Sequence, residues 1–195
     1  MKKVLLLLAN GFEVYEASVF IDVMGWNKVY GNSPTELITC GLTREVKSSF
    51  DHKFLVNSLV DEVNPDEFDA LAIPGGFEIF GFYNDAYHEK FLNLIRTFNE
   101  KSRNIASVCV GALPLGKSGI LNGKRATTYN KTAIRQETLR SFGVNVINQP
   151  IVIEGNIITS WNPSTAIEVA LNLLEMLTSA ENANHIRDLM GFKNA

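Results

Sequence analysis

Three short apolar runs, each followed by a turn, constrain the fold of this chain more than any other feature. They are Val4–Ala9, Asp69–Ile73 and Ile105–Cys109. Apolar runs without alternation are typical of parallel strands that are covered on both faces. Segments with helical periodicity lie between the runs, first from Glu13 to about Tyr30 and later from Asp85 to Lys101. This alternation predicts a doubly wound α/β/α sandwich with a mostly parallel central sheet.

The remaining segments continue the alternation. In the first helix we expect an inward stripe made of Val19, Val23, Trp26 and Tyr30. Further strands are expected at 36–40, 125–128, 144–147, 151–153 and 157–160, and further helices at 132–142, 164–178 and 183–190. A tight turn at 154–156 makes the last two strands a hairpin.

The overall composition and net charge of the chain narrow the class of protein. Neither repeats nor linkers interrupt the chain, so residues 1–195 are expected to form one domain. A formal net charge of −3 argues against binding to nucleic acid. Two cysteines, Cys40 and Cys109, do not make a disulfide framework for a domain of this size, so we expect a reducing, cytoplasmic setting. No apolar stretch is long enough to cross a bilayer, and the apolar start is too short for a signal peptide.

The segment Asn104–Pro114 contains the first candidate for chemistry. Its apolar run ends in Cys109, Gly111 follows two residues later, and a helix-like stretch comes next. This pattern predicts a strand that turns sharply into a helix and presents a nucleophile at the bend. Unpaired N–H groups and the helix dipole at such a bend favour a thiolate. The alternative is a structural cysteine buried as a small apolar group, and that interpretation is kept for Cys40, which no helix follows.

Two other strand ends supply candidate partners for the cysteine. Gly75 and Gly76 end the second apolar run, and we expect their N–H groups to form an oxyanion-binding site together with that of Val110. Glu13 and Glu16 follow the first run and share one helical face. They are either surface groups that complement the helix dipole or pocket carboxyls whose protonated form is favoured by burial. If the three strands are neighbours, these turns converge on one pocket.

A histidine partner for the cysteine is not evident. The three histidines, His52, His88 and His185, are not close to Cys109 in the chain. We expect all three on the surface, although the sequence leaves open whether His52 reaches the pocket. The residue types also indicate no metal site and no cofactor.

Four segments resemble the DJ-1/ThiJ/PfpI superfamily, and most closely its DJ-1 branch: Leu8–Glu16, Ile73–Gly76, Ala106–Gly111 and Thr159–Thr165. The resemblance covers nearly the whole chain. It implies a flavodoxin-like sandwich, a homodimer, Glu16 as the pocket glutamate, and Cys109 as a cysteine of low pKa that is readily oxidised to the sulfinate. Activities attributed to the family are glyoxalase and deglycase chemistry on methylglyoxal-type dicarbonyls, chaperone action in stress protection and, in other branches, peptidase or amidase activity.

Three positions depart from the family patterns. Val110 stands where the peptidase branch carries histidine, which argues against a cysteine peptidase. Tyr129 follows Thr127–Thr128 where the DJ-1 branch carries a pocket histidine, and tyrosine is a poor base at neutral pH. Phe50 stands where that branch places an arginine that reaches the partner's pocket, which weakens anion binding beside the sulfur.

Three functional hypotheses remain. In the first, Cys109 adds to the aldehyde of a small dicarbonyl, Glu16 shuttles protons, and the Gly75 and Val110 amides hold the oxyanion. In the second, Cys109 responds to oxidants by forming a sulfinate that Glu16 and the same amides stabilise. In the third, the fold carries no reactive centre. The substrate and the role of Tyr129 stay open.

Overall fold

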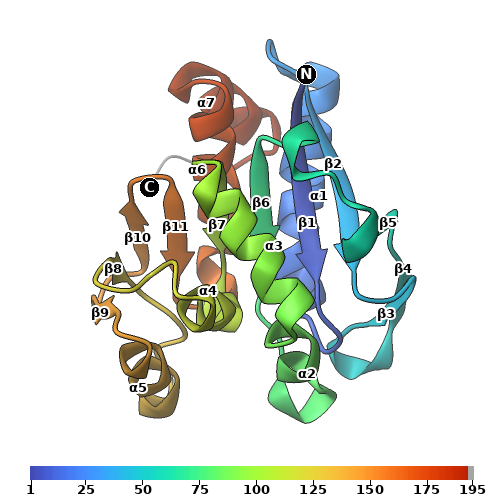
Figure 1. Cartoon of the computed structure of the whole chain (residues 1–195). Helices are drawn as coiled ribbons and strands as arrows, with labels where there is room; N and C mark the ends of the chain where they lie inside the picture. The colour runs from blue at the N-terminus through green and yellow to red at the C-terminus, as the bar shows by residue number, and fades with distance from the viewer. Residues whose placement is uncertain (193–195) are drawn as a thin grey trace.

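A seven-stranded sheet forms the centre of the computed structural model, which describes residues 1–192 (Figure 1). Its strand order is β10-β11-β7-β6-β1-β2-β5, and all pairs are parallel except the β10–β11 hairpin. The strands are β1 (Lys2–Leu8), β2 (Thr35–Gly41), β5 (Ser58–Leu59), β6 (Ala70–Ile73), β7 (Asn104–Ser107), β10 (Ile151–Glu154) and β11 (Ile157–Ser160).

Helices cover both faces of this sheet. Figure 1 shows α3 (Glu89–Glu100) crossing in front of the strands, next to α4 (Ala112–Ser118), while α1 (Val14–Tyr30) and α6 (Ala166–Leu177) lie behind. The last helix, α7 (Ala180–Leu189), packs on α6. This is the α/β/α sandwich that the apolar runs predict, and it has the flavodoxin-like form that the family resemblance implies.

Short elements complete the chain. A two-stranded antiparallel ribbon joins β3 (Glu45–Lys47) to β4 (Lys53–Leu55), and a parallel pair joins β8 (Arg125–Ala126) to β9 (Asn145–Val146). The remaining helices are α2 (Phe82–Ala86) and α5 (Ala133–Ser141). Single 3₁₀ turns are η1 (Ser49–Asp51), η2 (Val60–Glu62), η3 (Pro65–Glu67), η4 (Glu78–Phe80), η5 (Cys109–Gly111) and η6 (Pro163–Thr165).

The sheet topology explains why the predicted turns converge. β6 pairs with β1 on one side and with β7 on the other, so the carboxyl ends of the three apolar strands are adjacent. Every residue of β6 and the stretch Val4–Leu7 of β1 are buried, as expected of strands covered on both faces. Figure 1 shows β1 pointing toward the end of the molecule that carries α2 and α5. Ligand sites of such sheets lie at this edge.

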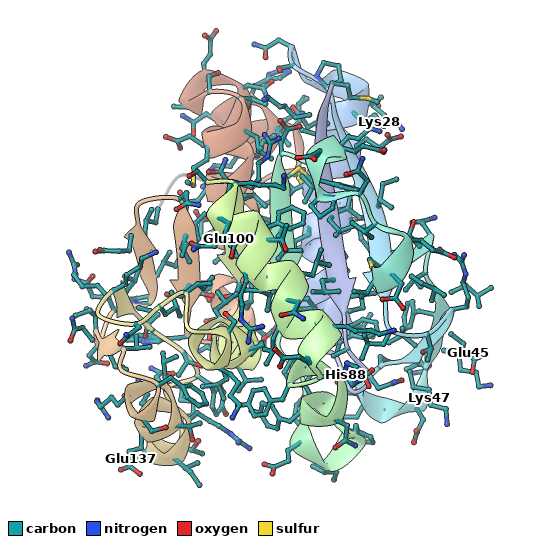
Figure 2. The ribbon with its side chains drawn as sticks, viewed as in Figure 1. Lys28, Glu45, Lys47, His88, Glu100 and Glu137 are labelled. Atoms are coloured by element: carbon teal, nitrogen blue, oxygen red, sulfur yellow. The ribbon has the colours of Figure 1, made fainter. Side chains whose placement is uncertain are left out.

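Two expectations about helices are wrong. The helix expected from Asp85 to Lys101 is interrupted, because α2 ends at Ala86 and α3 begins only at Glu89. His88 caps the start of α3 through its Nδ1 atom, which accepts a hydrogen bond from Lys90 N at 3.2 Å (Figure 2).

The second error concerns the outer face of α1. Trp26 and Tyr30 are 38% and 57% exposed rather than inward-facing, and their rings pack on each other at 5.5 Å. The buried stripe is centred instead on Glu16, Phe20, Val23, Met24 and Asn27. Trp26 lies beside this stripe, and Tyr30 ends the helix.

No helix within residues 1–192 combines the length and the apolar character that a membrane span requires. Over the same range, no group of three or more histidine, cysteine, aspartate or glutamate side chains is arranged to hold a metal ion.

Candidate active site

The turn after β7 has the geometry of a nucleophile elbow. The strand ends at Ser107, earlier than the sequence predicts, and Cys109 opens the turn η5 that leads into α4. Its φ of 57° lies in the left-handed region, which residues other than glycine rarely adopt and which is often found at functional sites. Two hydrogen bonds hold the turn: Thr128 Oγ1 donates to the Cys109 carbonyl at 2.9 Å, and Gly111 N donates to Val108 O at 2.9 Å.

Glycine at two positions lets the neighbouring strand ends approach this elbow. A Cβ atom on Gly75 would lie 2.9 Å from both Cys109 Cβ and Glu16 Oε2. A Cβ atom on Gly111 would lie 2.7 Å from the Ile73 carbonyl oxygen. Any side chain there would force the β6 turn away from the elbow, so these glycines are needed for close backbone approach.

Glu16 reaches the elbow from the first turn of α1. The side chain is fully buried, and Oε2 accepts a hydrogen bond from the Gly75 amide at 2.6 Å. Oε1 is buried without a hydrogen-bond partner, which is costly for a charged carboxylate. Burial and the nearby Glu13 raise the pKa of Glu16 to about 8, against the opposing effects of the Gly75 amide and the Cys109 thiol. At neutral pH the carboxyl is therefore mainly protonated.

Cys109 lies at the floor of a cavity, with 6% of its surface exposed. Burial raises the pKa of its thiol well above the ordinary value, and the carboxylates of Glu16 and Glu13 raise it further, while the Val110 amide lowers it. The expectation that the turn favours a thiolate is therefore not confirmed. The single amide donor that Val110 supplies from the turn η5 does not compensate for burial beside two acidic groups.

The predicted oxyanion-binding site needs one correction. Because the Gly75 N–H donates to Glu16, it is not free to bind an anion. Gly76 and Val110 both line the cavity. The amides that the structure leaves to a bound oxyanion are thus those of Gly76 and Val110.

The cavity above Cys109 has a volume of about 600 Å³ and opens to solvent. Glu13 and Tyr129 lie on its walls, and the buried Glu16 carboxyl adjoins its floor where Gly75 meets Cys109. His52, His88 and His185 are exposed, and none of them lines the cavity within the residues described. The site therefore pairs its cysteine with a carboxyl and not with an imidazole.

Sequence reasoning missed the residues at the mouth of the cavity. Arg135 of α5 pairs with Glu78 of η4 at 2.7 Å, and its guanidinium lies 5.3 Å from the centre of the Tyr83 ring. Ile79 and Ile134 stand beside this pair, one on each element. A separation of 57 residues between Arg135 and Glu78 leaves no local pattern that predicts their contact.

The fold and site together define a flavodoxin-like protein with an elbow cysteine and a buried acid. The family model of the DJ-1/PfpI family matches residues 2–176. The chain belongs to the DJ-1/PfpI family.

Similar proteins come from distant organisms. The protein dj-1beta of Drosophila melanogaster is 29% identical over 95% of this chain and 94% of its own length. Its crystal structure gives a TM-score of 0.86 at 27% identity, covering 99% of both chains. A deglycase of Thermococcus kodakarensis is 32% identical over 83% of this chain and 90% of its own. The DJ-1 homolog A of Arabidopsis thaliana is 27% identical over 97% of this chain, which spans only 46% of that protein.

Proposed function

We propose that this chain is a cysteine enzyme of the glyoxalase/deglycase type, which converts methylglyoxal-type dicarbonyls into α-hydroxy acids without glutathione. The observation that carries the proposal is that a buried, mainly protonated Glu16 meets the Cys109 elbow at Gly75, where a Cβ atom would lie 2.9 Å from both Glu16 Oε2 and Cys109 Cβ, at the floor of an open cavity. A nucleophile and a proton carrier side by side are the minimum that carbonyl addition and isomerisation require.

The first step is addition of the sulfur to the aldehyde carbon. As the S–C bond forms, the thiol proton passes through the Glu16 carboxyl to the carbonyl oxygen and gives a hemithioacetal. This route needs no free thiolate in the resting site, which agrees with the raised pKa of Cys109. The Gly76 and Val110 amides stabilise the negative charge that develops on oxygen.

The second step moves hydrogen within the bound substrate. Glu16, again protonated, gives its proton to the neighbouring carbonyl oxygen while its carboxyl takes the proton from the former aldehyde carbon, and an enediol forms. Returning a proton to the neighbouring carbon gives a thioester of an α-hydroxy acid, so one carbon is oxidised and the other reduced with no external oxidant. Water then hydrolyses the thioester, releasing lactate in the case of methylglyoxal and restoring the thiol.

The family supports this class of chemistry without fixing it. The similar protein of Thermococcus kodakarensis is named a deglycase, and it shares 32% identity with this chain. Tyr129 needs no basic role in the scheme, because Glu16 carries every proton transfer. Val110 beside the cysteine leaves the site without a histidine that would suit peptide hydrolysis.

Lactate formation from methylglyoxal in the absence of glutathione tests the proposal. Wild-type protein is expected to form lactate, and Cys109→Ser and Glu16→Gln are each expected to abolish it. Cys40→Ala is the matched control, because Cys40 is buried in the sheet away from the cavity, and its turnover should persist. Lactate formation by Cys109→Ser would contradict the proposal, as would its absence from the wild type.

A second function is favoured by the contrast between the two cysteines. Cys40 is fully buried within the sheet, whereas Cys109 borders the open cavity and can be reached by a small oxidant. In this alternative, two equivalents of hydrogen peroxide convert the Cys109 thiol to a sulfinate, with two molecules of water released. Mass spectrometry after mild peroxide treatment should find two added oxygens on Cys109 and none on Cys40. Equal oxidation of both cysteines would count against it.

The outer face of α1 supports a homodimer. Tyr15, Trp26, Val29 and Tyr30 are exposed on this helix. Several large apolar side chains on one surface are typical of a protein–protein contact. We propose that two copies of the chain meet through this face.

A further inference from the structure

The mouth of the Cys109 cavity is unusually apolar for a solvent-facing surface. Ile79 is 82% exposed and Ile134 is 60% exposed. Ile79 belongs to η4 and Ile134 to α5, so the two side chains line the cavity from different elements. Phe77 adds a half-exposed ring to the η4 side. Exposed apolar side chains grouped at a cavity are typical of a ligand-binding surface.

Several contacts hold the η4 wall in place. The Phe77 amide donates to the Gly11 carbonyl at 2.9 Å. The Phe50 ring packs against Phe77 and Phe80 at 5.6 Å each, and the backbone of Phe50 has a φ of 66°, in the left-handed region. The ion pair between Arg135 and Glu78 links the two walls at 2.7 Å. The apolar mouth is therefore preformed.

The charges of the cavity disfavour an anionic ligand. Among the described residues that line it, Arg135 is the only cation, and Glu78 already neutralises it at 2.7 Å. Glu13 adds an acidic group on the wall. A carboxylate or phosphate on the ligand would have to displace Glu78, whereas an uncharged apolar group can pack on Ile79 and Ile134 and leave the ion pair intact.

The volume of the cavity exceeds what the methyl group of methylglyoxal needs. A cavity of about 600 Å³ is in the range that holds a drug-sized molecule. We infer that Ile79 and Ile134 form a specificity subsite for a branched alkyl or aryl group, so the preferred substrates are uncharged α-oxoaldehydes with such a substituent. The α-oxoaldehyde head rests on the proposed function, whereas the apolar subsite above Cys109 does not.

Two alkylating agents with the same reactive head test the subsite without any turnover. Chloroacetamide and N-benzyl-2-chloroacetamide both form a thioether with Cys109 and release chloride and a proton. Each rate is divided by the rate of the same agent with glutathione, which removes the intrinsic reactivity. The corrected rate on Cys109 is expected to be at least about tenfold higher for the benzyl agent, as for a few buried carbons in an apolar pocket.

Matched variants locate the effect. Ile79→Ser and Ile134→Ser should each reduce the benzyl preference severalfold. Ile153→Ser is the control, because the Ile153 side chain on β10 is half-exposed and does not line the cavity, and it should leave the preference unchanged. A corrected preference near one, no alkylation of Cys109, or equal effects of the three variants would overturn the subsite.

Turnover then separates the subsite from the proposed function. With 4-methyl-2-oxopentanal in place of methylglyoxal, kcat/KM should rise at least about tenfold, and Ile79→Ser should remove most of that gain. Equal kcat/KM for the two aldehydes would overturn the inferred substrate class alone. A benzyl preference in alkylation without turnover of either aldehyde would keep the subsite and overturn the enzymatic proposal.

Discussion

Replacing Glu16 with glutamine is expected to remove a pH-dependent loss of stability. Burial raises the pKa of Glu16 from 4.5 to about 8 in the folded protein, whereas unfolding exposes the carboxyl to water and restores the ordinary value. Between these pH values the folded protein holds a proton that the unfolded chain has released, so the free energy of unfolding falls as pH rises. The fall is about 1.4 kcal/mol per pH unit, or about 5 kcal/mol across the window.

Denaturant unfolding at a series of pH values from about 5 to about 8 measures this effect. Protein concentration is held constant, because association would change the apparent stability. The stability of the wild type relative to Glu16→Gln should decline by about 1.4 kcal/mol for each pH unit. Glu100→Gln, on the exposed end of α3 (Figure 2), should follow the wild type. Parallel pH curves for the wild type and Glu16→Gln would refute the reasoning.

Four further predictions concern the elbow and the helix α1. Gly75→Ala should lower the free energy of unfolding by about 1–3 kcal/mol, because its Cβ would lie 2.9 Å from Cys109 Cβ. Gly25→Ala should instead raise the free energy of unfolding by about 0.5–1 kcal/mol, because a Cβ atom there has no neighbour within 4 Å. Urea midpoints equal to that of the wild type would contradict both glycine predictions. Thr128→Val should lower the free energy of unfolding by about 1 kcal/mol through loss of the 2.9 Å bond to the elbow carbonyl, and an unchanged midpoint would count against that role. Trp26→Asp should convert a dimer to a monomer in sedimentation velocity, and a monomeric wild type would exclude the α1 interface.

The sheet and the elbow were predictable because their signals are local. Val4–Ala9 and Ile105–Cys109 are apolar without alternation, and only strands covered on both faces suit that pattern. Adjacent strand ends then bring Glu16 to the elbow from α1. The split between α2 and α3 was missed, because His88 ends one helical pattern and starts the next without a proline or glycine between them.

The electrostatics and the mouth of the cavity were not predictable from local pattern. The pKa of Cys109 depends on how deeply the elbow is buried and on the Glu13 and Glu16 carboxylates beside it, which are properties of the packed molecule. The Arg135–Glu78 pair joins elements far apart in the sequence, and each residue alone resembles an ordinary surface charge. Ile79 and Ile134, which form the proposed specificity subsite, are neighbours of this pair in the chain, so their approach was equally invisible in the sequence.

The proposed chemistry depends on one proton that Glu16 holds beside the Cys109 elbow. Infrared difference spectroscopy of the wild type against Glu16→Gln reports that proton directly, through the carbonyl stretch of a protonated carboxyl. A band for protonated Glu16 is expected at pH 6, and it should disappear as the pH rises through about 8. A difference spectrum at pH 6 that shows only an ionised carboxylate would contradict the proposed chemistry.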